Sequence, residues 1–170
     1  MSERSFTRFL FLNEKTKPSL WTASHMDRMI RELKIFQPSI LEADPAVLAR
    51  LCRYISDTGK DVFQPGLIVL TYEYPTKFHI QQIKKIFKVP IASSYGSTET
   101  GFVFMQCENG RFHQNSEFCR VDFEPLQSEQ GGPQLGRILV TTFKNPWYYL
   151  IHFDVGDIVI LNEDKKCPCG

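Results

Sequence analysis

The chain has 170 residues, of which 42% are hydrophobic and 23% charged, so it has the composition of a globular protein of one ordinary domain or two small ones. Twenty basic residues against 19 acidic residues leave a net charge of +1, which argues against a protein that binds nucleic acid through a large basic surface. The sequence contains no apolar run of about 18 residues, so we expect no membrane span. The charged N-terminal residues do not resemble a signal peptide, and with five cysteines the chain is expected to be cytoplasmic, with free or metal-bound thiols.

The first hundred residues alternate predicted strands with predicted helices. Ser24 is a candidate helix cap, and Asp44-Pro45 combines a side-chain acceptor with a proline in the first helical turn. Pro38 and Gly59 predict where these two helices end. In chain order we expect a strand at 6–12, helices at 24–37 and 45–58, a strand at 67–71, a helix at 77–87 and a strand at 89–92. This alternation is typical of a mainly parallel sheet with helical crossovers.

After Gly101 the pattern changes to short strands separated by turns. The turns are indicated by Glu108-Asn109-Gly110 and Gly131-Gly132-Pro133. The expected strands lie at 102–106, 117–123, 137–143, 149–153 and 158–161. We therefore predict an α/β subdomain at residues 1–101, followed at 102–170 by a small antiparallel β-barrel-like subdomain or sheet.

A loop rich in glycine and hydroxyl groups follows the predicted strand at 89–92. It contains Tyr95, Gly96, Ser97, Thr98 and Glu99. At the carboxyl end of a buried strand, such a loop can bring backbone amides and hydroxyls close to a phosphate, and a carboxylate there suits Mg²⁺. An ordinary turn between two elements has the same composition, so the loop alone leaves both interpretations open.

A second polar segment lies between two predicted strands near the C-terminus. Gly156-Asp157 there can present a carboxylate to the paired hydroxyls of a ribose. Taken alone, a Gly-Asp pair is a routine turn.

The two segments together resemble the motifs of the adenylate-forming superfamily. Residues 95–99 are similar to its Tyr-Gly-Ser/Thr-Thr-Glu motif, and Gly156-Asp157 is similar to the end of its Tyr-Arg-Thr-Gly-Asp motif. The phenylacetate–CoA ligase-like branch is the most similar, because Thr141-Thr142 and the run Cys167-Pro168-Cys169-Gly170 have counterparts there. The resemblance extends over nearly the whole chain.

The resemblance implies an enzyme that joins a carboxylic acid to AMP from ATP and then transfers the acyl group to CoA or a carrier thiol. It implies catalytic roles for Thr98 and Glu99. The roles implied for single residues are adenine contact by Tyr95, close backbone approach at Gly96, α-phosphate binding by Ser97 and Thr98, Mg²⁺ binding by Glu99, ribose binding by Asp157 and a place beside the nucleotide for Glu73.

Several features depart from the family pattern. Tyr72 precedes Glu73 where the family has glycine, and His152 stands where arginine is common. A phosphate loop and a lysine-bearing lid domain are not found in the sequence, so other domains or a partner chain are expected to complete the activity. The alternative is a non-catalytic descendant that acts as a nucleotide-binding or assembly module. The fourteen phenylalanines leave room for an apolar interface, with a homo-oligomer as one possibility.

A separate set of residues suits a metal. Cys107 and His113 flank the predicted turn at 108–110, and Cys167 and Cys169 lie near the C-terminus. Three thiols and an imidazole match the preferences of structural Zn²⁺. The other interpretation is that Cys107 is an ordinary buried residue and His113 a surface residue. A zinc-stabilised structural domain without nucleotide is a third overall hypothesis, which the segments containing Glu99 and Asp157 argue against.

Overall fold

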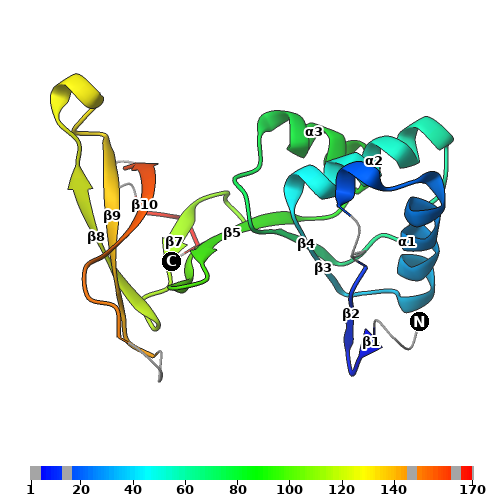
Figure 1. Cartoon of the computed structure of the whole chain (residues 1–170), viewed down its shortest axis with the longest axis horizontal. Coiled ribbons are helices and arrows are strands. Elements are labelled where there is room, and N and C mark those ends of the chain that lie inside the picture. Colours follow the sequence, from blue (N-terminus) through cyan, green and yellow to red (C-terminus); the bar gives the residue numbers. More distant parts are fainter. Residues whose placement is uncertain (1–4, 13–16, 145–148, 162–165, 170) are drawn as a thin grey trace. The chain divides into compact units, whose positions relative to one another are not determined.

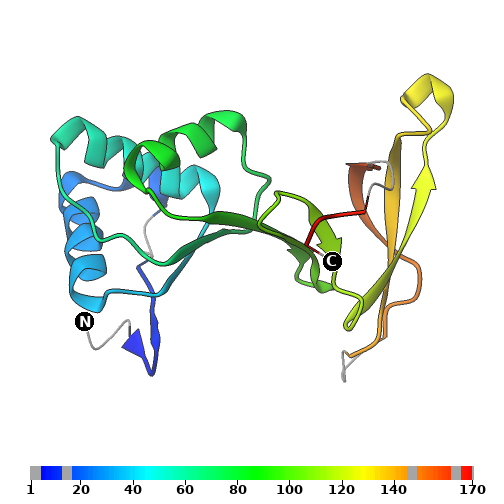
Figure 2. The same cartoon turned by 180° about the vertical axis from the view of Figure 1, so that it is seen from behind.

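The structure is a computed structural model that describes residues 5–12, 17–144, 149–161 and 166–169. The chain divides into two compact units, Met1–Ile91 and Ala92–Gly170, and each is considered by itself (Figures 1 and 2). Among the described helices, none has the length and apolar character needed to cross a membrane.

The first unit contains the α-helices and the parallel strands. Helices α2 and α3 pack against each other (Figure 1). In chain order its elements are β1 (Ser5–Phe6), β2 (Phe9–Leu10), the 3₁₀ helix η2 (Pro18–Leu20), α1 (Ala23–Phe36), β3 (Ile40–Ala43), α2 (Pro45–Thr58), β4 (Leu67–Leu70) and α3 (Lys77–Ile86). The predicted strand at 6–12 is a short hairpin of β1 and β2, and β3 was not predicted.

Local sequence signals set the limits of the helices. Asp44 accepts a hydrogen bond from the Val47 amide at 2.9 Å, Pro45 opens α2, and Gly59 ends it with a φ of 64°. The cap of α1 is Thr22 and not the predicted Ser24, because the Thr22 side chain accepts from the backbone while His25 bonds back to the Thr22 amide at 3.1 Å. The helix ends at Phe36, before Pro38, as predicted.

The core of the first unit lies between helices and strands. Ile68 and Leu70 of β4 are fully buried, as are Ile83 of α3 and the adjoining Phe87. They belong to one apolar cluster with the inward faces of α1 and α2. Leu67 and Val69 of the same strand are partly buried, so the apolar run at 67–70 is fully buried on one face and partly covered on the other.

One mixed sheet has the strand order β3-β4-β5-β6-β7. Strands β3 and β4 are parallel, as the alternating pattern predicted, whereas β6 (Gly101–Gln106) is antiparallel to both β5 (Ile91–Ser97) and β7 (Phe112–Gln114). The strand predicted at 89–92 is therefore displaced. It begins at Ile91 and ends at Ser97, so it includes the first part of the glycine- and hydroxyl-rich segment, and the turn that was expected there is confined to residues 98–100.

The second unit adds a three-stranded antiparallel sheet in the order β10-β9-β8, and this sheet does not close into a barrel. It consists of β8 (Cys119–Pro125), β9 (Leu135–Thr142) and β10 (Phe153–Ile160), with the 3₁₀ helix η3 (Ser128–Gln130) between β8 and β9. Two separate strands were predicted at 149–153 and 158–161. The structure instead has one strand whose pairing with β9 shifts between Asp154 and Ile158, because the Gly-Asp segment forms a bulge and not a turn between strands.

A small apolar cluster holds the second unit together. Val103 from β6 meets Cys119 from β8 and Ile138 and Val140 from β9, and all four are buried. Tyr95 and Val155 pack against this cluster from β5 and β10. The segments that carry the two sequence motifs therefore share one core.

The burial of β4 generates a stability prediction. Ile68→Ala should lower the free energy of unfolding by about 2–5 kcal/mol, because it removes a fully buried side chain and leaves a cavity. Ile40→Ala on the paired strand β3 is the matched control, since Ile40 is 58% exposed and its loss should change stability by about 0.5 kcal/mol or less. Urea unfolding followed by the helical circular dichroism signal compares them, and equal costs would contradict the described core.

Candidate functional site

The turn between β5 and β6 is locked by two hydroxyl side chains. Ser97 Oγ lies 3.0 Å from Thr100 Oγ1 and accepts from the Thr100 amide at 3.2 Å, while the Ser97 amide donates to Thr100 Oγ1 at 3.3 Å. Thr100 is buried. Thr100 was not singled out in the sequence, although two hydroxyls three residues apart are a recognised signal for a side-chain-locked turn.

Gly96 allows a very close approach of two backbone segments. A Cβ at this position would lie 2.0 Å from the carbonyl oxygen of Gly101, although Gly96 itself is exposed. The pairing of β5 with β6 also shifts between Tyr95 and Gly96. The glycine is therefore required by the backbone path of the turn itself.

Thr98 and Glu99 occupy the exposed tip of this turn. A hydrogen bond from the Ser97 side chain, with a further backbone hydrogen bond, lowers the pKa of Glu99. An ionised, accessible carboxylate is a hard oxygen ligand, so this position fits one ligand of a Mg²⁺ ion.

A hydrogen bond joins the two motif segments, which are 62 residues apart. The Tyr95 hydroxyl donates to Asp157 Oδ2 at 2.5 Å. The Tyr95 ring packs beside Phe104, with ring centroids 5.8 Å apart. Burial, followed by the hydrogen bond to Asp157, raises the pKa of Tyr95, so the phenol remains a donor at neutral pH.

The backbone near Asp157 is shaped by its neighbours in β10. Gly156 has a φ of 83°, and its amide donates to Asp154 Oδ1 at 2.9 Å. The other oxygen of Asp154 pairs with Arg137 at 2.9 Å. Asp154 therefore holds the bulge that presents Asp157, a positioning role that the sequence analysis did not assign.

The two residues that depart from the family pattern lie in unusual backbone conformations. His152 has a φ of 49°, and its Nε2 lies 3.1 Å from a carboxylate oxygen of Asp122. Tyr72 has a φ of 75° and is exposed. Glu73 is also exposed and follows β4 in the first unit, so its place beside a nucleotide stays a prediction.

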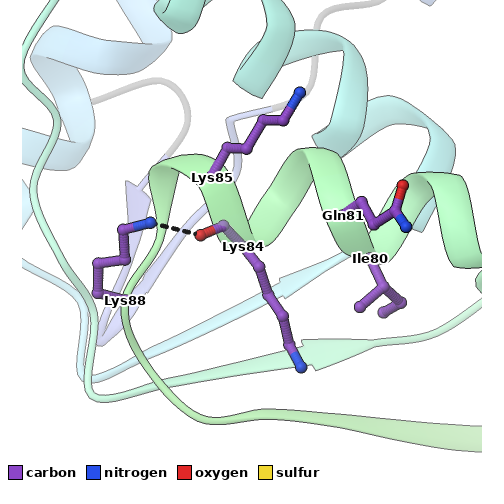
Figure 3. A pocket seen from close by; sticks show the side chains of 5 residues that line it. All are labelled: Ile80, Gln81, Lys84, Lys85 and Lys88. Carbon is purple, nitrogen blue, oxygen red and sulfur yellow. Dashed lines mark hydrogen bonds between the residues drawn. The ribbon is translucent and has the colours of Figure 1, made fainter.

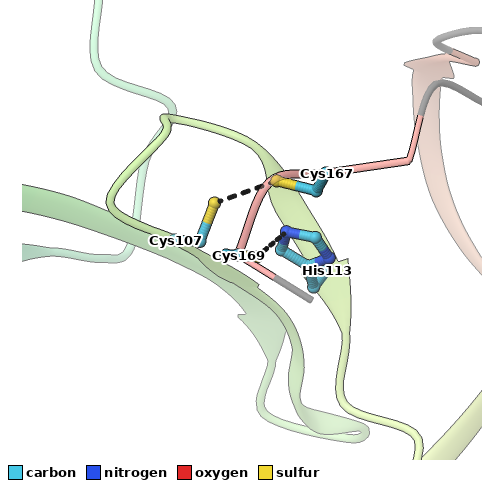
Figure 4. Close-up of side chains that lie close together, drawn as sticks. All are labelled: Cys107, His113, Cys167 and Cys169. Atoms are coloured by element: carbon cyan, nitrogen blue, oxygen red, sulfur yellow. Dashed lines mark hydrogen bonds between the residues drawn. The ribbon is translucent and has the colours of Figure 1, made fainter.

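The four predicted metal ligands lie together (Figure 4). Their ligand atoms are all within 4.8 Å of one another. Cys107 Sγ lies 3.7 Å from Cys167 Sγ, and Cys169 Sγ lies 3.3 Å from His113 Nε2. Cys107 and His113 are both partly buried, so the alternative of a buried Cys107 and a surface His113 does not describe them.

The thiols in this cluster influence one another. Burial raises the pKa of Cys107, but hydrogen bonds from the Arg111 backbone and from His113 outweigh it and lower the pKa to about 6. Hydrogen bonding to Cys167, with burial and Cys107, raises the pKa of Cys169 to about 12. By contrast, Cys52 and Cys119 are buried in the two apolar cores, as expected of packing residues.

A shallow depression on α3 is a weaker candidate for a binding site. It is lined by Ile80, Gln81, Lys84, Lys85 and Lys88. Lys84 and Lys85 point away from each other, and Lys88 donates to the Lys84 carbonyl at 2.8 Å (Figure 3). These ammonium groups do not converge on one ligand: Lys84 and Lys85 are exposed on α3, and Lys88 is exposed just after the helix ends.

Solved structures of CoA ligases contain the same fold. The chain is similar to 2-hydroxyisobutyryl-CoA ligase in complex with R3-HIB-AMP, with a TM-score of 0.69 at 13% identity over 85% of this chain. It is also similar to a long-chain-fatty-acid-CoA ligase (FadD1) from Archaeoglobus fulgidus, with a TM-score of 0.58 at 10% identity over 81% of this chain. VinN in complex with L-aspartate gives a TM-score of 0.53 at 16% identity over 79%.

The chain spans only part of these proteins. It covers 32% of the 2-hydroxyisobutyryl-CoA ligase, 34% of FadD1 and 38% of VinN. No protein-family model matches the chain, and no curated protein matches it. At these identities the similarity shows the fold, and the reaction must be argued from the site.

The close approach at Gly96 generates a second prediction. Gly96→Ala should destabilise the second unit by about 1–3 kcal/mol, because the new methyl group meets backbone that cannot move without breaking the turn. Thr98→Ala at the exposed tip of the same turn is the control and should have little effect. Amide hydrogen exchange of residues 95–102 reports the change, and wild-type protection in the Gly96 variant would show that this close approach is not needed.

Proposed function

We propose that this chain provides the nucleotide-binding part of an ATP-dependent ligase that activates a carboxylic acid. In the first step the carboxylate attacks the α-phosphorus of ATP, forming an acyl-AMP and releasing pyrophosphate. In the second step a thiol of CoA or of a carrier attacks the acyl carbon and AMP leaves. The phenylacetate–CoA ligase-like branch is the branch we propose, on the similarity of residues 141–142 and 167–170.

The observation that carries this proposal is the contact between Tyr95 and Asp157. Two motifs that the family uses on one nucleotide are brought within hydrogen-bonding distance by strands far apart in the sequence. The hydrogen bond uses one oxygen of Asp157, and Oδ1 can accept from a ribose hydroxyl. The partly buried ring of Tyr95 provides a flat surface at the same place for adenine.

The turn after Tyr95 is assigned to the phosphates. Ser97 is held by Thr100, so its hydroxyl is oriented before any ligand arrives, and Thr98 is exposed beside it. Glu99 would hold Mg²⁺, whose charge would offset the negative charge that develops on the phosphate oxygens. Thr98 and Glu99 would therefore make the catalytic contribution of this segment, and Glu73 is proposed as a further nucleotide-binding residue.

A second candidate function is a non-catalytic nucleotide-binding or assembly module. The specific observation in its favour is His152, which stands where the family often has arginine and whose Nε2 lies 3.1 Å from a carboxylate oxygen of Asp122. The ligase proposal accommodates this if other domains or a partner chain contribute further groups around the phosphates.

We also propose that the protein is located in the cytoplasm.

Binding of an adenylate analogue tests the assignment of Asp157. Asp157→Ala should weaken the binding of AMP or of an acyl-sulfamoyl adenosine by roughly 10- to 150-fold, the loss expected for one hydrogen bond to a charged group. Tyr95→Phe should have a smaller effect, because it keeps the ring and removes only the hydroxyl that orients Asp157. Isothermal titration calorimetry measures both affinities.

Asp61→Ala is the matched control for that experiment. Asp61 is an exposed carboxylate whose side chain is 88% accessible, and it lies in the first unit opposite Lys34. Its removal should leave the affinity unchanged. Equal affinity in the Asp157 variant and wild type would remove the ribose contact from the proposal.

A reaction measurement separates the two candidate functions. The chain alone should bind the analogue but catalyse little exchange of pyrophosphate into ATP, because most of the groups that stabilise charge on the phosphates would come from other domains. Adding the remaining domains of the ligase should restore exchange. Exchange by the chain alone at ordinary ligase rates would contradict the need for other domains, and no exchange even in the complete protein would favour the non-catalytic module.

A further inference from the structure

We propose that Cys107, His113, Cys167 and Cys169 bind one structural zinc ion that fastens the segment after β10 to the hairpin of β6 and β7. The site is independent of the nucleotide and would exist without it. The four ligands come from two places in the chain, two flanking one turn and two near the C-terminus (Figure 4). An ion there would cross-link residues about 60 apart in the sequence.

The distances fit a tetrahedral ion. Bonds of about 2.3 Å from zinc to sulfur place two thiolate sulfurs roughly 3.8 Å apart. Cys107 Sγ and Cys167 Sγ are 3.7 Å apart, whereas a disulfide requires about 2.05 Å. A sulfur and an imidazole nitrogen on the same ion would be roughly 3.6 Å apart, and Cys169 Sγ lies 3.3 Å from His113 Nε2.

The hairpin presents its two ligands on one face. Met105 of β6 pairs with His113 across the antiparallel ladder, and Cys107, two residues after Met105 and just past the end of β6, lies on the same side of the hairpin as His113. Gly110 closes the turn with a φ of 75°, and the Cys107 amide donates to the Arg111 carbonyl at 2.8 Å. Half of the site is therefore already formed by ordinary hairpin geometry.

The ligand set favours zinc and a structural role. Three sulfurs and one imidazole suit a borderline-soft ion without a redox function, whereas Mg²⁺ and Ca²⁺ prefer oxygen ligands. Four protein ligands complete a tetrahedron, so no coordination position is left for water or substrate. The ion would therefore stabilise the protein without taking part in the acyl transfer.

The hairpin is also connected to the strand that carries Tyr95. The Gln106 side chain accepts from the Ser93 amide at 3.0 Å and donates to the Gly110 carbonyl at 2.9 Å. Ser93 lies in β5, two residues before Tyr95. Cys167 follows β10, the strand of Asp157. Zinc would thus restrain the backbone of both residues in the Tyr95–Asp157 hydrogen bond.

The direct test is the metal content of protein purified under reducing conditions without added metal. Inductively coupled plasma mass spectrometry should find about one zinc ion per chain. The double variant Cys167→Ala/Cys169→Ala and the single variant His113→Ala should lose most of this zinc. Cys119→Ala is the matched control, since Cys119 is a buried cysteine outside the cluster and its replacement should leave the zinc content at the wild-type level.

Cobalt substitution checks the geometry if a variant folds poorly. Wild-type protein loaded with Co²⁺ should show the visible spectrum of a tetrahedral ion with thiolate charge-transfer bands. Zinc-free protein after reduction, iron in place of zinc, a Cys107–Cys167 disulfide, or unchanged zinc in the Cys167/Cys169 variant would overturn the proposal. None of these measurements uses a nucleotide, so their outcome is independent of the test on Asp157.

Discussion

The second unit depends on a close contact between two backbone segments, which only glycine permits. The absent side chain of Gly96 lets β5 and β6 pair immediately after a short turn. That pairing fixes where Thr98 and Glu99 emerge and brings the Tyr95 ring against the core shared with β9. Gly96 has no side chain to make contacts, but it determines where Tyr95, Thr98 and Glu99 lie, because any larger residue would block the close approach of the two backbone segments.

Asp157 shows how an exposed carboxylate can be held in place by a hydrogen bond from a partly buried partner. Its partner Tyr95 is the partly buried member of the pair and remains protonated, so it donates a hydrogen bond to an acceptor that is more accessible to solvent. Asp154 stabilises the bulge by accepting a hydrogen bond from the Gly156 amide, and it forms an ion pair with Arg137. Two nearby carboxylates therefore have different roles, set by their hydrogen-bond partners.

Much of the first unit could be predicted from the sequence, because its signals are local. The cap at Asp44, the proline after it and Gly59 define α2 within a few residues of chain. The grouping of three cysteines and one histidine could also be predicted, because thiol and imidazole groups are the ligands that zinc prefers. The course of β10 was not, because a Gly-Asp pair looks the same in a bulge as in a turn, and only pairing with β9 distinguishes them. The contacts between Ser97 and Thr100 were missed although they are local, because the spacing of two hydroxyls three residues apart was not used as a turn signal.

The bulge in β10 has a consequence for how this strand tolerates change. From Asp154 to Ile158 the chain advances four residues, while the paired positions on β9 advance only two, from Leu139 to Arg137. The surplus of two is even, so the alternation of inward and outward side chains is the same on both sides of the bulge. Loss of one residue would leave a surplus of one, the ordinary bulge, with Ile158 still opposite Arg137. Loss of both Gly156 and Asp157 would leave no surplus, so the ladder would run on without a bulge while the carboxylate bonded to Tyr95 is gone. The residues of the bulge can therefore change in number without changing the pairing of the strand around them.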